Sequence, residues 1–278
     1  MHDGRRPHRY TAAITQLVFR LHPGFVRHFT TIGNAALDLL LPTSCAGCGS
    51  RDTRELRARG LCASCVRDIR QQRPLQWQLG GLQKAFAAAA YDGVVRSALL
   101  EYKERGRLCL RRELANCLVV SVLAALQSAA LADPFGQPAV LLVPVPSAKA
   151  TRRARGHHPV RAMARTAGAQ LRAAGLDVRT CDVLRHMRTV ADQSGLDIGA
   201  RYTNLAGALG VAHPFSVQGR SVIVVDDIVT TGATALEAVR ALTAAGAMVC
   251  AVACVAATAK RSDISNRKLR GMSDRARL

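Results

Sequence analysis

Hydrophobic and polar positions alternate in blocks along the second half of the chain. Three continuous apolar runs predict buried strands, at residues 140–146, 220–227 and 248–256. Between them, residues 159–174 and 233–245 repeat apolar positions at helical spacing, and Gly175 and Gly246 follow these segments as C-terminal caps. Buried strands that alternate with helices are typical of a parallel sheet, so the expected fold class is α/β.

The pattern before residue 140 is less regular. The segment from Ala85 predicts a strand, a turn at Asp92-Gly93 and a helix, and a second helix is expected over about 108–131. Residues 66–81 are polar and resemble a connector, whereas residues 35–41 form a short apolar run that predicts a helix.

Two adjacent carboxylates, Asp226 and Asp227, end the apolar strand in the stretch VIVVDDIVTTGAT. The carboxyl edge of a parallel sheet is where α/β proteins bind ligands. The loop that follows offers backbone N–H groups, hydroxyls and a helix N-terminus, which together favour an anion, and Gly232 permits close backbone approach. A sugar phosphate fits, with its hydroxyls bound by the aspartates directly or through Mg²⁺. The alternative is a capped Thr/Gly turn beside solvated aspartates.

A basic segment follows the strand at 140–146. Its cations are Lys149, Arg152, Arg153 and Arg155. A pyrophosphate would need such cations, and Lys103 is a further candidate for the same pocket. The alternative is a solvated basic loop.

Four cysteines form two knuckles with the spacing of a metal site. They are Cys45, Cys48, Cys62 and Cys65. Each CxxC aims two thiolates at one point, so the pattern predicts a closed, structural Zn²⁺ site, with a disulfide pair or an iron–sulfur cluster as alternatives. The remaining five cysteines lie in apolar or helical stretches, which favours buried thiols and a reducing, cytoplasmic compartment.

Charge adds a further expectation. The 278-residue chain carries 39 Lys and Arg against 19 Asp and Glu, a net charge of +20. Such an excess favours a phosphate-rich partner such as DNA, bound without sequence preference, or else reflects a solvated basic surface. Aromatic residues make up only 4%, which argues against a stacking platform for single strands. No apolar run approaches the ~20 residues of a membrane span.

The stretch VIVVDDIVTTGAT resembles the 5-phosphoribosyl-1-pyrophosphate (PRPP) motif of type I phosphoribosyltransferases. Together with LVPVPSAKATRRARG, AYDGVVRSALLEYKERGR and the cysteine blocks, it makes roughly residues 35–258 similar to the ComF family of competence-associated proteins. The resemblance implies that Asp226 and Asp227 contact the ribose hydroxyls. It assigns the 5-phosphate to Thr230, Thr231, Gly232, Ala233 and Thr234. It also implies that Val145, Pro146 and Ser147 face the pyrophosphate and that the basic segment folds over the pyrophosphate.

The resemblance also implies an organisation and a function. We expect a poorly ordered extension at 1–34, a zinc-ribbon-like module at 35–80, a phosphoribosyltransferase-like domain at 81–259 and a basic disordered tail at 260–278. The implied activity is transfer of phosphoribosyl to an unknown acceptor with release of pyrophosphate, linked to DNA uptake or nucleotide metabolism. The alternative is a non-catalytic PRPP- or nucleotide-sensing adaptor that binds DNA and partner proteins such as a DNA-uptake helicase.

Two departures from the family pattern concern the substrate. His157, His158 and Pro159 stand where the family usually has Phe-Asn-Gln, and Arg107 stands where it usually has Asp. Both positions bear on the recognition of the acceptor more than on that of PRPP.

Overall fold

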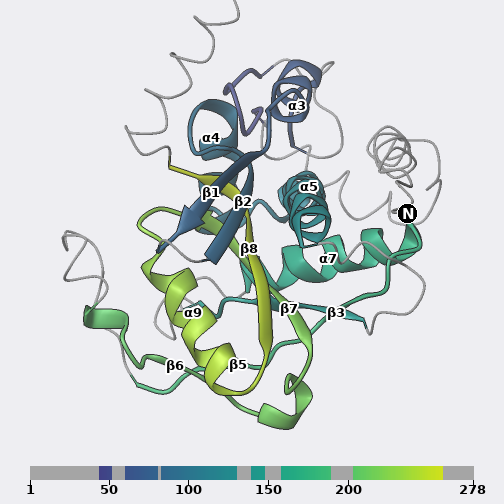
Figure 1. The fold of residues 1–278 in the computed structure, drawn as a ribbon. Helices are drawn as coiled ribbons and strands as arrows, with labels where there is room; N and C mark the ends of the chain where they lie inside the picture. The colour runs from purple at the N-terminus through teal and green to yellow at the C-terminus, as the bar shows by residue number, and fades with distance from the viewer. Residues whose placement is uncertain are drawn as a thin grey trace, which may run out of the picture. The chain divides into compact units, whose positions relative to one another are not determined.

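A six-stranded sheet in the order β1-β2-β8-β7-β3-β4 organises the part of the chain that the computed structural model describes (Figure 1). That part comprises residues 44–51, 60–80, 83–129, 139–147, 158–188 and 203–258. The strands are β1 (Leu75–Leu79), β2 (Gln83–Ala90), β3 (Val140–Pro144), β4 (Val178–Thr180), β7 (Ser221–Val229) and β8 (Met248–Ala257). All neighbours are parallel except β1, which runs antiparallel to β2. The predicted α/β class is therefore confirmed.

Helices cover both faces of this sheet. The helices and short 3-10 turns are α3 (Ala63–Arg70), α4 (Gly93–Glu104), η1 (Leu108–Leu110), α5 (Arg111–Ser128), α7 (Pro159–Ala173), η2 (Pro214–Ser216) and α9 (Ala233–Ala244). Helices α5 and α7 pack together on one face (Figure 1). Helix α9 covers the other face, together with a two-stranded sheet of β5 (Leu184–His186) and β6 (Leu209–Val211).

Strands β7 and β8 occupy the centre because their sequences are almost wholly apolar. From Ser221 to Asp227 every residue of β7 is buried. Side chains alternate along a strand, so Val222 and Val224 join the core under α9, while Ile223 and Val225 point to the opposite face. Asp226 and Asp227 continue this alternation at the carboxyl end, one toward each face.

The prediction of a connector at residues 66–81 is wrong. Residues 63–70 form α3, and residues 75–79 form β1, which extends the main sheet. The apolar positions Leu75, Trp77 and Leu79 alternate with exposed glutamines and pack on the core under α9. This two-residue period is the signature of a half-buried strand, and it outweighs the polar composition of the segment.

The other predicted elements that can be compared agree with the structure. The helix expected over 108–131 is present as η1 and α5, and the later strands and helices match within a few residues. Residues 35–41 and the tail from 260 lie outside the described residues. Among the helices of the described part, none is long and apolar enough to cross a membrane.

Candidate functional site

The two carboxylates lie at the carboxyl end of the central strand β7 and are both buried. Asp226 is 9% exposed and Asp227 6%. The backbone N–H of Asp227 donates to Asp226 Oδ1 over 2.8 Å. Asp227 Oδ2 pairs with Lys103 Nζ of α4 at 2.8 Å. The pair is therefore part of a compact charged group at the edge of the sheet.

Burial and charge give Asp226 an unusual titration. Burial, and next the negative charge of Asp227, raise the pKa of Asp226 to about 8, although the Asp227 N–H and the Lys103 ammonium oppose the shift. Near neutral pH the Asp226 carboxyl is therefore largely protonated and can donate a hydrogen bond. Because the Asp227 carboxylate is matched by Lys103, the three groups together carry little net charge.

The loop from 230 to 234 joins β7 to α9. Gly232 has φ 84°, in the left-handed region, and stands at the N-cap of α9. The Ala233 N–H approaches Thr231 Oγ1 at 3.4 Å, and Thr258 Oγ1 donates to the carbonyl of Thr230. The loop thus presents the start of a helix at the same edge of the sheet as the carboxylates, as the sequence predicted.

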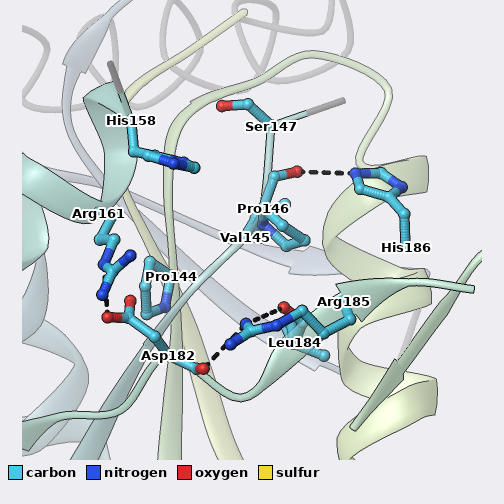
Figure 2. Close-up of a pocket in the computed structure, with 10 residues that line it drawn as sticks. All are labelled: Pro144, Val145, Pro146, Ser147, His158, Arg161, Asp182, Leu184, Arg185 and His186. Carbon is cyan, nitrogen blue, oxygen red and sulfur yellow. Dashed lines mark hydrogen bonds and ion pairs between the residues drawn. The ribbon is translucent and has the colours of Figure 1, made fainter. Parts of the chain in front are cut away.

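A cavity of about 360 Å³ opens at the end of the neighbouring strand β3 (Figure 2). It is lined by Pro144, Val145, Pro146, Ser147, His158, Arg161, Asp182, Leu184, Arg185 and His186. Since Pro144 pairs with Val225 of β7, this cavity and the carboxylates lie at the same edge of the sheet, on adjacent strands.

Several polar groups in this cavity are fixed by contacts with one another. Arg161, in the first turn of α7, pairs with Asp182 at 2.6 Å, and Arg165 reaches the same carboxylate at 3.0 Å. His186 Nε2 lies 3.1 Å from the carbonyl oxygen of Pro146, a contact that holds the β3 turn against β5 (Figure 2).

Val145, Pro146 and Ser147, which the resemblance assigns to the pyrophosphate, line this cavity. His158, at the N-cap of α7, lines the same cavity. The basic residues expected beside them, Lys149, Arg152, Arg153 and Arg155, lie outside the described residues, as does His157. Lys103, expected here as well, instead contacts Asp227.

Sequence reasoning missed Arg161, Asp182, Arg185 and His186. Arg161 could have been found, because Pro159 marks the first turn of a helix and places Arg161 at its N-terminal end. The other three lie on or beside the three-residue strands β4 and β5, which are too short to give a periodic signal.

The four cysteines converge on one point. Their sulfur atoms all lie within 4.8 Å of one another. Cys48 Sγ and Cys62 Sγ are 3.8 Å apart, too far for a disulfide. Four thiolates at about 2.3 Å from a tetrahedral Zn²⁺ would be separated from one another by about 3.8 Å, so the donor set fits this metal. Iron–sulfur clusters are held by the same four thiolate donors.

Polar hydrogens favour the thiolate form at Cys45 and Cys62, whereas burial, and next the hydrogen bond with Cys62, raise the pKa of Cys65. The backbone N–H groups of Gly47 and Cys62 donate to Cys45 Sγ over 3.4 and 3.3 Å. The hydrogen bond from Ser64, and next that from the Cys65 backbone, lower the pKa of Cys62 to about 6. Such donors suit a site in which charged sulfur ligates a cation.

The comparison with protein families agrees with the edge just described. Residues 170–273 match the family model of the phosphoribosyl transferase domain. The matched span contains Asp226, Asp227 and the loop to α9, and it excludes the four cysteines and the β3 turn. The comparison with curated proteins gave no match. This part of the chain is thus similar to phosphoribosyl transferase domains.

Proposed function

We propose that the chain binds PRPP at the carboxyl edge of its sheet and transfers the phosphoribosyl group to an acceptor with release of pyrophosphate. The observation that carries this proposal is the carboxylate pair at the end of β7, followed at once by the N-terminus of α9. Both lie in the span that is similar to phosphoribosyl transferase domains.

The ligand would lie across two adjacent loops. Its 5-phosphate would bind the N–H groups and hydroxyls of Thr230, Thr231, Gly232, Ala233 and Thr234. Its ribose hydroxyls would bind Asp226 and Asp227. Its diphosphate would face Val145, Pro146 and Ser147, where His158 and Arg161 lie at the N-terminus of α7. The basic segment containing Lys149, Arg152, Arg153 and Arg155 is proposed to close over the diphosphate.

The state of the carboxylates favours direct contact with hydroxyls. Without a bound cation, Asp226 favours its protonated form and Asp227 is paired with Lys103, so the pair does not present two bare carboxylates. They can instead donate to one ribose hydroxyl and accept from the other. A Mg²⁺ ion that arrives on the diphosphate would offset negative charge on that group.

In the transfer step, the bond between the anomeric carbon and the diphosphate oxygen breaks, and the acceptor forms a new bond to that carbon. The electron pair leaves with pyrophosphate, and the acceptor's proton passes to solvent or to pyrophosphate. The buried carboxylates would hold the ribose in place, while arginines near the β3 turn would stabilise the charge of the leaving group.

Titration calorimetry with PRPP and Mg²⁺ tests the site. Asp227→Asn should weaken binding by about 10- to 100-fold, the usual cost of a lost hydrogen bond to a charged group. Asp177→Asn, at an exposed position before β4, serves as the matched control and should bind like wild type. Equal affinity of wild type and Asp227→Asn would remove the carboxylates from the site.

For the four cysteines we propose one structural Zn²⁺ per chain, held by Cys45, Cys48, Cys62 and Cys65. The convergence of four sulfur atoms, three of them on buried residues, supports a site closed to substrate. Such an ion would fix the segment around Cys45 to the start of α3.

The ComF type, with a role in DNA uptake, is the finer form of this proposal. Its non-catalytic alternative is an adaptor that senses PRPP or a nucleotide and binds DNA, and the net charge of +20 supports DNA contact. Pyrophosphate release with candidate acceptors identifies the enzyme. Fluorescence anisotropy with labelled DNA over a range of salt tests the adaptor, and the absence of binding at low salt would count against it.

A further inference from the structure

Helix α4 lies between the four-cysteine cluster and the carboxylate pair, and it contacts the neighbourhood of both. At its first turn, Val94 packs on Gly47, between Cys45 and Cys48. A Cβ on Gly47 would lie 2.7 Å from Val94 Cγ1 and 2.7 Å from Cys65 Sγ. The contact between the cluster and helix α4 therefore leaves no room for an added methyl group at Gly47.

The other end of α4 is tied to the cluster by Arg107. The backbone N–H of Arg107 donates to the carbonyl of Glu101, and the preceding Gly106 has φ 65°, so the chain reverses direction at the end of the helix. This turn brings the Arg107 side chain back along the helix. One of its nitrogens donates to the carbonyl of Ser44 at 2.7 Å, and the other lies 3.5 Å from Glu101 Oε2. Ser44 immediately precedes the ligand candidate Cys45.

The last turn of α4 is also fixed on the side of the carboxylates. Lys103 Nζ contacts Asp227 Oδ2 at 2.8 Å, with side chains only 20% and 8% exposed. The neighbouring Tyr102 is fully buried, and its hydroxyl donates to the carbonyl of Pro159 at the start of α7. One helical turn therefore joins the cluster, the carboxylate pair and the start of α7.

We infer that α4 couples the four-cysteine cluster to the ligand site, with Arg107 as the tie and Lys103 as the positioning residue that neutralises Asp227. The inference rests on the proposed function only for the identity of the ligand. A buried carboxylate that loses its cation is strongly disfavoured. A shift of α4 that moves Lys103 away from Asp227 would therefore destabilise the Asp227 carboxylate. An intact cluster keeps Ser44 in place for Arg107, and Arg107 keeps the last turn of α4 in place for Lys103.

The chain contains a matched control for Arg107. Arg105 also pairs with Glu101, but its side chain is 75% exposed. Arg105 pairs with Glu101 on α4 itself, whereas Arg107 reaches Ser44, outside the helix. Arg105→Met and Arg107→Met therefore both remove an ion pair with Glu101, and only Arg107→Met also removes the link to the cluster.

Hydrogen–deuterium exchange on the zinc-loaded full chain tests the coupling without a ligand. Arg107→Met should speed exchange by about 10- to 100-fold, as the loss of one charged hydrogen bond gives, in peptides covering residues 99–107 and 226–232. Arg105→Met should leave residues 226–232 at the wild-type rate. Equal behaviour of the two variants, or an increase confined to residues 44–70, would overturn the inference.

PRPP titration then tests whether the coupling reaches the ligand. Lys103→Met should weaken binding, Lys103→Arg should largely restore it, and Arg107→Met should weaken it in the same direction. If both residues act through one contact, the double variant should bind no more weakly than Lys103→Met alone, whereas additive losses would overturn the coupling. Failure of wild type to bind PRPP would refute the proposed function, while the exchange experiment would still decide the coupling.

Discussion

Leu79 of β1 packs directly against Gly232, the residue from which α9 begins. The adjacent Gly80 lies against Leu236 in the first turn of the same helix, where a Cβ would come within 2.9 Å of Leu236 Cδ1. The end of β1 therefore rests on the loop proposed to hold the phosphate. Glycine is required at position 232 by this contact and by its left-handed φ of 84°, independently of any ligand.

Gly232→Ala should destabilise the protein by about 1–3 kcal/mol, because the added methyl group overpacks Leu79 and the backbone is strained. Gly175→Ala is the matched control, since Gly175 has φ 87° and no atom within 4 Å of its would-be Cβ. It should cost only the backbone strain, about 1 kcal/mol. Urea denaturation measures both, and equal losses would show that Leu79 yields without cost.

The raised pKa of Asp226 predicts a stability that falls with pH. Its pKa is about 8 in the folded chain, against about 3.9 for an ordinary aspartate, so between these values the folded state holds a proton that the unfolded state has lost. Stability from this group is present below about pH 4 and is lost as pH rises through 8. Asp226→Asn should flatten the dependence of stability on pH between these values, while Asp177→Asn should keep that dependence. Denaturant melts at several pH values check this. If the assignment is wrong, the free energy of unfolding will depend on pH in Asp226→Asn as it does in wild type.

The central part of the fold could be predicted because the residues within each of its elements are buried in a regular pattern. Strands β7 and β8 are buried on both faces, so continuous apolar runs identify them, and the two aspartates stand out at the end of such a run. Helices α7 and α9 show one apolar stripe, and each is followed closely by a glycine with positive φ, Gly175 or Gly246. Local signals and tertiary environment agree in these elements.

The rest of the site depends on contacts between distant segments. Lys103 and Asp227 are separated by more than a hundred residues, and no local pattern indicates that they meet. Arg107 gives no signal of its own in the sequence, yet its guanidinium lies between Ser44 and Glu101. Arg161 and Asp182 pair only because α7 and β4 lie side by side.

A buried glutamate holds the small sheet against α9. Glu237 is 5% exposed, accepts the N–H of Leu209 at 2.9 Å, and binds two nitrogens of Arg240 at 2.8 Å each. Burial alone would raise the pKa of Glu237, but the hydrogen bonds from Arg240 and Leu209 outweigh it and lower the pKa. Stability from this group is therefore present above the ordinary pKa of a glutamate and is lost as pH falls through its lowered folded value.

Glu237→Ala should cost about 1–3 kcal/mol, because it leaves the Leu209 N–H without its acceptor. Glu237→Gln keeps an acceptor oxygen and should cost less. Thermal melts compare the two variants. A loss in Glu237→Ala no greater than that in Glu237→Gln would mean that the charge, and not the bond to β6, stabilises this sheet.

The four-cysteine cluster should hold a metal ion in the purified protein. Elemental analysis of protein purified without chelator should find about one zinc per chain in wild type. Cys62→Ser should lose the metal, since Cys62 contributes one of the four converging sulfur atoms. Cys250→Ser, a free cysteine outside the cluster, should keep it. Because a structural zinc site contributes its binding free energy to folding, Cys62→Ser should also melt at a lower temperature than Cys250→Ser. Iron in place of zinc would identify an iron–sulfur cluster. Four reactive thiols with no metal in wild type would show that these cysteines do not form a metal site.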